Sequence, residues 1–166
     1  MAAADGRKLA RFARGVSGPL AALGRSSPRA LGGTRDGGLF KKIDCHSIPV
    51  ADLDAALIFY RDGLGHELIW RDDSAAGLRL PDSDAELVLH IDERPIETDL
   101  LVASVPAAIA RFVEAGGKVI AQPFEIRIGL CAVIEDPWQN RLVILDASKG
   151  LLRTDAEGKI IESGAA

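Results

Sequence analysis

Hydrophobic positions recur with helical spacing in two stretches of the chain, 50–60 and 102–112. In each stretch the apolar residues fall at i, i+3, i+4 and i+7, which is the spacing of one buried helix face. The two stretches align when the chain is shifted by 52 residues, so the pattern predicts two equivalent helices. The matching residues are Leu53, Ala56, Leu57 and Tyr60 in the first copy and Val105, Ala108, Ile109 and Phe112 in the second.

The ends of the two predicted helices also match. Asp52 and Ser104 stand at the N-cap position, and Gly65 and Gly117 stand where a helix end needs a residue that tolerates a positive φ angle. The strand 86–92 resembles 141–147, so the duplication extends beyond the helices. The predicted helices are 52–64 and 104–115, and the predicted strands are 41–50, 66–71, 76–80, 86–92, 97–103, 118–125, 129–135 and 141–146.

This order of elements is a βαβββ unit that occurs twice, at about 41–92 and 97–148. Neither unit buries both faces of a four-stranded sheet by itself, so we expect the two to join. The sequence therefore predicts an α+β fold in which two βαβββ modules form one eight-stranded curved mixed sheet with a central cleft. We assign this domain to 39–150, with a basic extension at 1–38 and a C-terminal tail at 151–166.

Composition and charge narrow the functional classes. The chain has 166 residues, 48% of them hydrophobic and 27% charged, which is typical of a folded globular protein. No apolar run approaches the length of a membrane span, and two cysteines cannot form a disulfide framework, so we expect a cytoplasmic protein without a membrane partner. Residues 41–166 hold thirteen basic and twenty-two acidic side chains, a net charge of −9 that argues against a nucleic-acid partner.

The first 38 residues differ from the rest of the chain. Residues 1–40 hold seven basic and two acidic side chains, and Leu9, Phe12 and Val16 lie at helical spacing among them. Arg-rich, Ser-containing leaders of this kind resemble organelle transit peptides, which would place the protein in an organelle. The alternative is a disordered tail that carries no chemistry.

Three motifs within the domain point to a known superfamily. They are 48–65, which reads IPVADLDAALIFYRDGLG, the helix end 114–117, which reads EAGG, and the turn 135–140, which reads EDPWQN. Together with the duplication, they resemble the vicinal oxygen chelate superfamily, which includes glyoxalase I, bleomycin-resistance proteins and extradiol dioxygenases. The resemblance implies the fold and a ligand cleft between the modules, but this scaffold hosts many functions.

Metal-dependent members of this superfamily take ligands from the first and last strand of each copy. The resemblance places those four positions at Cys45, Val88, Glu97 and Val143 of this chain. Valine has no donor atom and a catalytic ion needs about three protein ligands, so we expect no metal and no other cofactor. His90 follows Val88 by two residues and points to the same side of its strand. An irregular metal site of Cys45, His90 and Glu97 therefore stays open as an alternative.

Several other side chains are candidates for ligand contact. We expect His90 and Glu97 to form an acid–base pair, and Cys45, Val88 and Val143 to line the cleft. Trp70, on the same strand face as Leu68, could be a stacking wall, and Arg141 could reach a carboxylate or phosphate. Their alternative roles are structural: a small buried thiol for Cys45, a rim carboxylate for Glu97, a core residue for Trp70 and a surface ion pair for Arg141.

Three functions follow from these expectations. The first is a small-molecule-binding protein or metal-independent enzyme, and it rests on the two valines. The second is a metal-dependent lyase, isomerase or oxygenase that uses the irregular site. The third is a structural or regulatory homodimer whose cleft is filled by side chains. We expect a homodimer with a small-molecule ligand in the first two cases as well.

Overall fold

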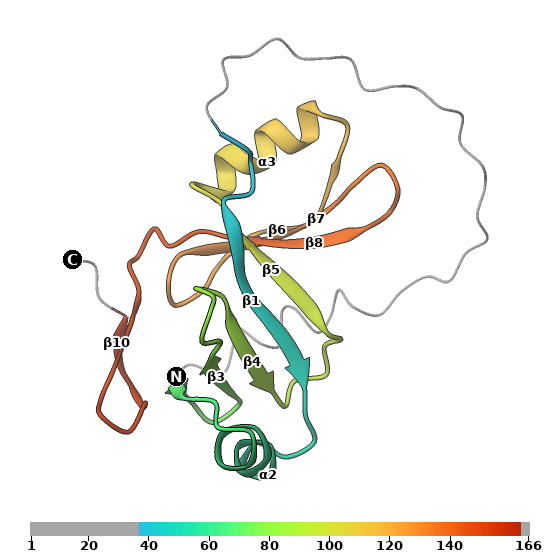
Figure 1. Cartoon of the computed structure of the whole chain (residues 1–166). Coiled ribbons are helices and arrows are strands. Elements are labelled where there is room, and N and C mark those ends of the chain that lie inside the picture. Colours follow the sequence, from blue (N-terminus) through green and yellow to red (C-terminus); the bar gives the residue numbers. More distant parts are fainter. Residues whose placement is uncertain (1–36, 164–166) are drawn as a thin grey trace.

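A computed structural model describes residues 37–163 of the chain (Figure 1). The predicted leader falls almost wholly outside this range. The elements in chain order are β1 (Lys42–Pro49), α2 (Leu53–Leu57), the π-helical turn η1 (Ile58–Gly63), β2 (Leu68–Arg71), β3 (Ala75–Arg79), β4 (Glu86–His90), β5 (Glu97–Leu101), α3 (Val105–Glu114), β6 (Lys118–Glu125), β7 (Leu130–Glu135), β8 (Arg141–Leu145), β9 (Leu152–Thr154) and β10 (Ile160–Ser163).

Eight strands form one mixed sheet in the order β2-β3-β4-β1-β5-β8-β7-β6. The first module supplies one half and the second module the other, and the halves join where β1 pairs antiparallel with β5. Within the modules β1 is parallel to β4 and β5 is parallel to β8, so each βαβββ unit has the same internal order. The predicted duplicated α+β fold is therefore confirmed.

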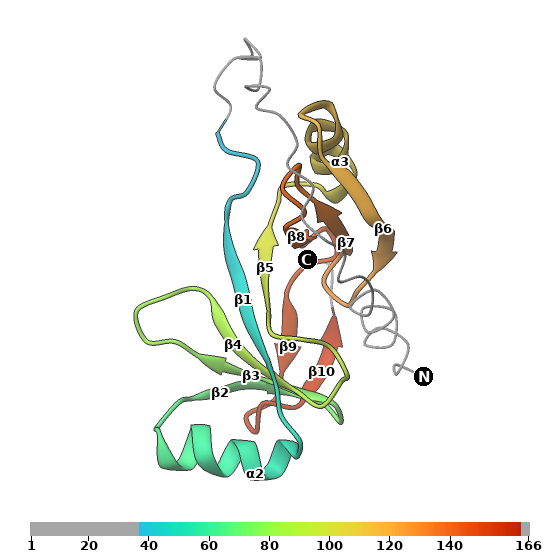
Figure 2. The same ribbon diagram turned by 90° about the vertical axis from the view of Figure 1, so that its right-hand side faces the viewer.

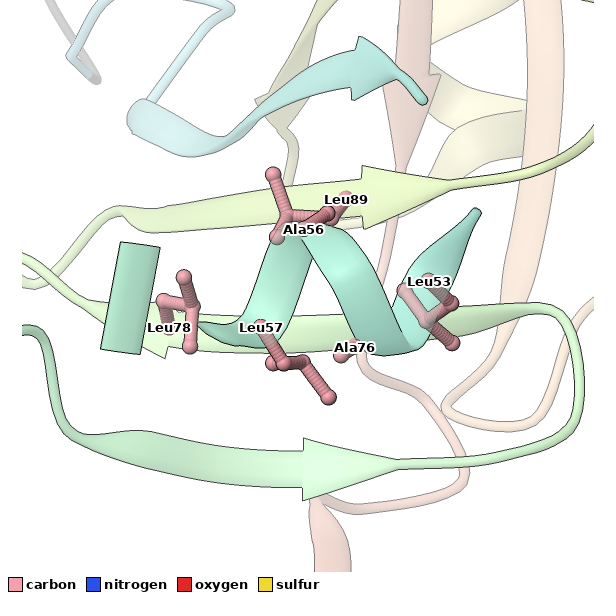
Figure 3. Close-up of a cluster of buried hydrophobic side chains, with 6 residues drawn as sticks. All are labelled: Leu53, Ala56, Leu57, Ala76, Leu78 and Leu89. Carbon is pink, nitrogen blue, oxygen red and sulfur yellow. The ribbon is translucent and has the colours of Figure 1, made fainter. Parts of the chain in front are cut away.

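The two helices cover the same face of the sheet, one over each module. α2 packs on β3 and β4 through a cluster of buried apolar side chains (Figure 3). α3 packs on β7 and β8 in the equivalent way. Figure 2 shows the two helices at opposite ends of the molecule. The clusters are Leu53, Ala56, Leu57, Ala76, Leu78 and Leu89 in the first module and Val102, Val105, Ala108, Ala132, Ile134 and Ile144 in the second. The opposite sheet face is therefore left for other contacts.

The helix ends agree with the sequence at three of four positions. The Asp52 carboxylate accepts a hydrogen bond from Ala55 N at 2.9 Å, and Ser104 Oγ accepts one from Ala107 N at 3.5 Å. Gly65 has a φ of +80° as expected. In the second copy, however, Gly116 takes the positive φ, at +100°, and not Gly117. Gly117 has a different role, because a Cβ there would lie 2.1 Å from the Phe112 ring.

The segment assigned above to a C-terminal tail contains two further strands. β9 and β10 form a two-stranded hairpin, and Gly158 near its tip accepts a hydrogen bond from Arg71 N at 2.8 Å. Strands of three and four residues are too short to show a clear alternation, so they could not be predicted from the hydrophobic pattern. No helix among residues 37–163 is long and apolar enough to cross a bilayer.

Candidate functional site

The sheet face that the helices leave uncovered carries the candidate residues, and we call it the inner face. Strand register places them in rows. Cys45 of β1 lies opposite Asp99 of β5, which lies opposite Val143 of β8. In the next row Ser47 lies between Val88 of β4 and Glu97 of β5. The four positions implied by the superfamily, Cys45, Val88, Glu97 and Val143, therefore share the inner face.

In the first module, the Trp70 indole covers this face. It packs on a cluster of Cys45, Ala75 and Val88, and its Nε1 donates a hydrogen bond to Glu86 Oε2 at 2.6 Å. Gly77 lies beneath it, since a Cβ there would lie 2.1 Å from Trp70 Nε1. Burial raises the pKa of Glu86, and the indole N–H partly offsets this by stabilising the carboxylate.

Leu68 does not share the face of Trp70, contrary to the expectation from simple alternation. The register of β2 against β3 shifts between Leu68 and Trp70, so one additional residue separates the two pairings. A bulge of this kind reverses the side-chain direction along a strand. Leu68 consequently packs with the cluster under α2, while Trp70 points to the inner face.

In the second module, apolar side chains bury Val143. It belongs to a cluster with Ala121, Cys131, Val133 and Leu145. Partly buried residues of β6 and of the loop that follows it pack against this cluster, among them Phe124, Ile126 and Ile128. Val88 in the first module and Val143 in the second are therefore each buried among apolar side chains. The polar residues of the inner face lie between them.

The polar centre of the inner face is formed by Asp99, Cys45 and Ser47, all buried. The Cys45 thiol donates a hydrogen bond to Asp99 Oδ2 at 3.5 Å and lies 3.7 Å from Ser47 Oγ. Burial, with the nearby Asp99, raises the pKa of the Cys45 thiol, so it is a poor nucleophile. Burial and the charge of Glu97 raise the pKa of Asp99 to about 7. Asp99 Oδ1 has no hydrogen-bond partner among residues 37–163.

His90 is the second buried polar group on this face. It has 0% exposure, and among the described residues its ring nitrogens make no hydrogen bond of normal length and angle, although the Asp92 backbone interacts weakly with the ring. Burial and the positive charge of Arg94 lower its pKa to about 4, and the smaller opposing effect of Asp92 does not reverse this. The imidazole is therefore neutral at pH 7, with one donor and one acceptor nitrogen to offer.

The expected pair of His90 and Glu97 does not form. Glu97 is instead paired with Arg94, which also lies 3.8 Å from Asp92. β1 separates the two residues, because His90 lies opposite Pro49 and Glu97 lies opposite Ser47. Glu97 therefore has its charge balanced within the chain.

The remaining candidate, Arg141, and three other polar or aromatic side chains form contacts away from the polar centre. Arg141 Nε is 3.6 Å from Glu135 Oε2, in a surface ion pair. Arg127 forms an ion pair with Asp72 of the first module, at 2.9 Å. His46, the neighbour of Cys45 in β1, is exposed and hydrogen-bonded to Thr98. Cys45 is therefore the one of these two residues that faces inward, as expected. Trp138 is 74% exposed in its turn.

The residues present do not fit a divalent metal ion at the superfamily positions. Val88 and Val143 offer no donor atom, and Glu97 is already paired with Arg94. The irregular alternative fails on geometry, because Cys45 and the residue opposite His90 are four positions apart on β1, or about 13 Å. Within residues 37–163, no three His, Cys, Asp or Glu side chains are grouped to hold a metal ion.

Comparison with known proteins agrees with the fold. The sequence profile of the Glyoxalase/Bleomycin resistance protein/Dioxygenase superfamily matches residues 42–144. The chain belongs to this superfamily. A search of curated proteins finds no match.

Solved structures of this superfamily show the same fold at low sequence identity. Methylmalonyl-CoA epimerase from Mycobacterium tuberculosis is 22% identical, with a TM-score of 0.55 over 72% of this chain and 94% of its own. The Streptomyces coelicolor epimerase with 2-nitronate-propionyl-CoA is 20% identical, with a TM-score of 0.56 over 66% and 99%. Homoprotocatechuate 2,3-dioxygenase from Brevibacterium fuscum, with 3,4-dihydroxyphenylacetate, is 21% identical, with a TM-score of 0.50 over 65% and 37%. At these identities the likeness extends to the fold alone.

Sequence reasoning missed Asp99 and Arg94. Asp99 has a detectable signal, since the 52-residue shift places it on Ser47 and it shares the strand face of Glu97. Arg94 lies in the connection between the modules, which has no counterpart elsewhere in the duplication. Only the structure shows that it neutralises Glu97.

Proposed function

We propose that the chain binds a small organic molecule at the inner face, where His90 and Asp99 meet it, without a divalent ion at the superfamily positions. The observation that carries this proposal is a set of buried atoms without a hydrogen-bond partner of normal geometry among residues 37–163: both ring nitrogens of His90 and Oδ1 of Asp99. A buried polar group without a partner costs about 1–3 kcal/mol, which a bound molecule with matching groups would recover. Val88 and Val143 support the absence of an ion.

The chemistry of these groups describes the ligand. His90 is neutral and offers one donor and one acceptor, and Asp99 exchanges a proton near pH 7. A hydroxyl, carbonyl or amide group satisfies such atoms. If the chain is an enzyme, Asp99 is the group whose pKa suits proton transfer near neutrality, whereas Glu97 is held by Arg94.

A second function has its own support. Trp70 packs on Cys45 and Val88, and the side chains that follow β6 pack on Val143, so much of the inner face is already covered. This favours the structural role in which the expected cleft has become core. The two functions differ in one observable, which is whether any compound occupies the face.

A thermal-shift screen tests the proposal. Full-length protein treated with a chelator is screened against small carbonyl, hydroxyl and carboxyl compounds, including methylmalonyl-CoA and 3,4-dihydroxyphenylacetate. We expect compounds that raise the midpoint and lose this effect with Asp99→Asn, but keep it with Asp82→Asn, a change at an exposed carboxylate. Binding that needs an added divalent ion would support the metal-dependent function, and the absence of any binder would support the structural one.

A further inference from the structure

An ion pair joins the segments that follow the two edge strands of the sheet. β2 and β6 stand at opposite ends of the strand order. Asp72 directly follows β2, and Arg127 follows β6 by two residues, yet Arg127 Nη1 and Asp72 Oδ2 are only 2.9 Å apart. The eight-stranded sheet stays open, because β2 and β6 do not pair with each other. The ion pair instead links the turn 72–75 of the first module to the loop 126–129 of the second.

The C-terminal segment also joins the first module to the second, and we call residues 147–163 the strap. At its start Lys149 N donates to Ile128 O at 2.9 Å, and Lys149 Nζ donates to Ile126 O at 3.2 Å, on the second module. Near its end Gly158 accepts from Arg71 N at 2.8 Å, on the first module. Figure 1 shows the strap running from the β8 side of the molecule down to the β3 side.

The buried polar atoms lie behind this closure. The turn that begins at Asp72 ends at Ala75, because Asp72 Oδ1 accepts hydrogen bonds from Ser74 N and Ala75 N, both at 2.8 Å. Ala75 lies opposite His90 in the next strand. Asp72, the ion-pair partner of Arg127, therefore belongs to the turn beside His90, which has 0% exposure.

We propose that the seam between the turn 72–75 and the loop 126–129, closed by the Arg127–Asp72 ion pair and by the strap, is the gate through which a small molecule reaches the inner face. This inference rests on the proposed function. The seam is joined by an ion pair and by the hydrogen bonds of the strap, whereas the strands of the sheet are joined by continuous hydrogen-bonded ladders. The seam is therefore where the inner face is uncovered at the lowest cost in free energy.

The accessibility of the Cys45 thiol reports this opening without any ligand. Cys45 is buried on the inner face, and Cys131→Ala leaves it as the single thiol of the chain. In that background we expect 4,4′-dithiodipyridine to modify Cys45 slowly in the otherwise unaltered protein. Arg127→Ala should raise the rate of modification about 3- to 10-fold, which is the effect expected from the loss of one partly buried ion pair. Ending the chain at Gly150, which removes most of the strap, should raise it further.

Arg61→Ala is the matched control, because it removes an Arg–Asp ion pair of η1 that takes no part in the contacts of the seam. Its rate should equal that of the parent. Urea unfolding of each variant separates local opening from global loss of stability, since a rate that merely follows global stability would contradict the gate. If the shortened chain does not fold, Lys149→Ala replaces it, and exchange of the Arg71 amide hydrogen reports release of the strap.

Equal rates for Arg127→Ala and Arg61→Ala would overturn the inference. Failure of the gate and failure of the proposed function give different experimental results. Faster thiol modification with no compound ever bound would leave the gate standing and remove the function. A bound compound whose association rate is unchanged by Arg127→Ala would leave the function standing and remove the gate.

Discussion

At the scale of single residues, Asp99 is the most unusual group in the molecule. It is a carboxyl group 8% exposed that lies among a thiol, a hydroxyl and a valine, and no cation within residues 37–163 is paired with it directly. Arg94 lowers its pKa, but burial and the charge of Glu97 raise it more. A fold that keeps such a group bears a cost in stability, which is what we expect of a residue retained for ligand contact.

The pH dependence of stability tests this view of Asp99. With a folded-state pKa of about 7 against an ordinary 3.8, the folded chain holds a proton that the unfolded chain releases, so stability falls as pH rises through this window. Asp99→Asn removes the titration. We expect the variant to be more stable than the parent at pH 8, by about 1–3 kcal/mol, and nearly equal at pH 4. Urea unfolding at both pH values measures this, and a variant less stable at pH 8 would contradict it.

Gly77 is a second residue with a defined role. An added Cβ would collide with the Trp70 indole and also lie 2.7 Å from Glu86 Oε2. Although alanine is ordinarily better than glycine in a strand, Gly77→Ala should therefore destabilise the fold by about 1–3 kcal/mol. In a Trp70→Ala background the same change should cost far less. Equal costs in both backgrounds, measured by urea unfolding, would show that the indole does not lie across Gly77.

At the scale of elements, the two helices provide an internal comparison. Asp52 and Ser104 cap equivalent helices, but the hydrogen bond at Asp52 is 2.9 Å long and that at Ser104 is 3.5 Å. Asp52→Ala should therefore cost about 1–2 kcal/mol, and Ser104→Ala should cost less, about 0.5 kcal/mol. Denaturant unfolding of the two variants gives the comparison. The opposite order would mean that packing, and not the cap, decides these helix ends.

The elements were largely predictable from the sequence because periodicity and duplication report burial directly. Leu53 to Tyr60 and Val105 to Phe112 carry a helical period, and a 52-residue shift carries the inward position of Cys45 over to Glu97. Contacts across the sheet could not be predicted in this way. The bulge between Leu68 and Trp70 adds one residue to β2, and no residue type in the sequence indicates it. The ion-pair partner of Glu97 lies in an irregular connection, whose shape the hydrophobic pattern does not predict.

At the scale of the whole molecule, the chain has the superfamily fold, and valines stand at two of the four positions that the resemblance assigns to metal ligands. The inner face of the eight-stranded sheet carries two valines, the Trp70 indole, and two buried polar groups, His90 and Asp99, that have atoms without a hydrogen-bond partner among residues 37–163. The Arg127–Asp72 ion pair and the strap join the first module to the second. These features favour a ligand that is surrounded when bound and is held by hydrogen bonds and apolar contacts.

The measurement that tests this account most directly is the mapping of amide chemical shifts by NMR. Chelator-treated, isotope-labelled protein is titrated with a compound that raises its thermal midpoint. We predict that the largest shifts fall on the inner-face residues of β1, β4 and β5, above all Ser47, His90 and Asp99, and that Asp99→Asn weakens the binding. Shifts centred elsewhere, for example on the exposed Trp138 turn, or binding that appears only after a divalent ion is added, would contradict the account.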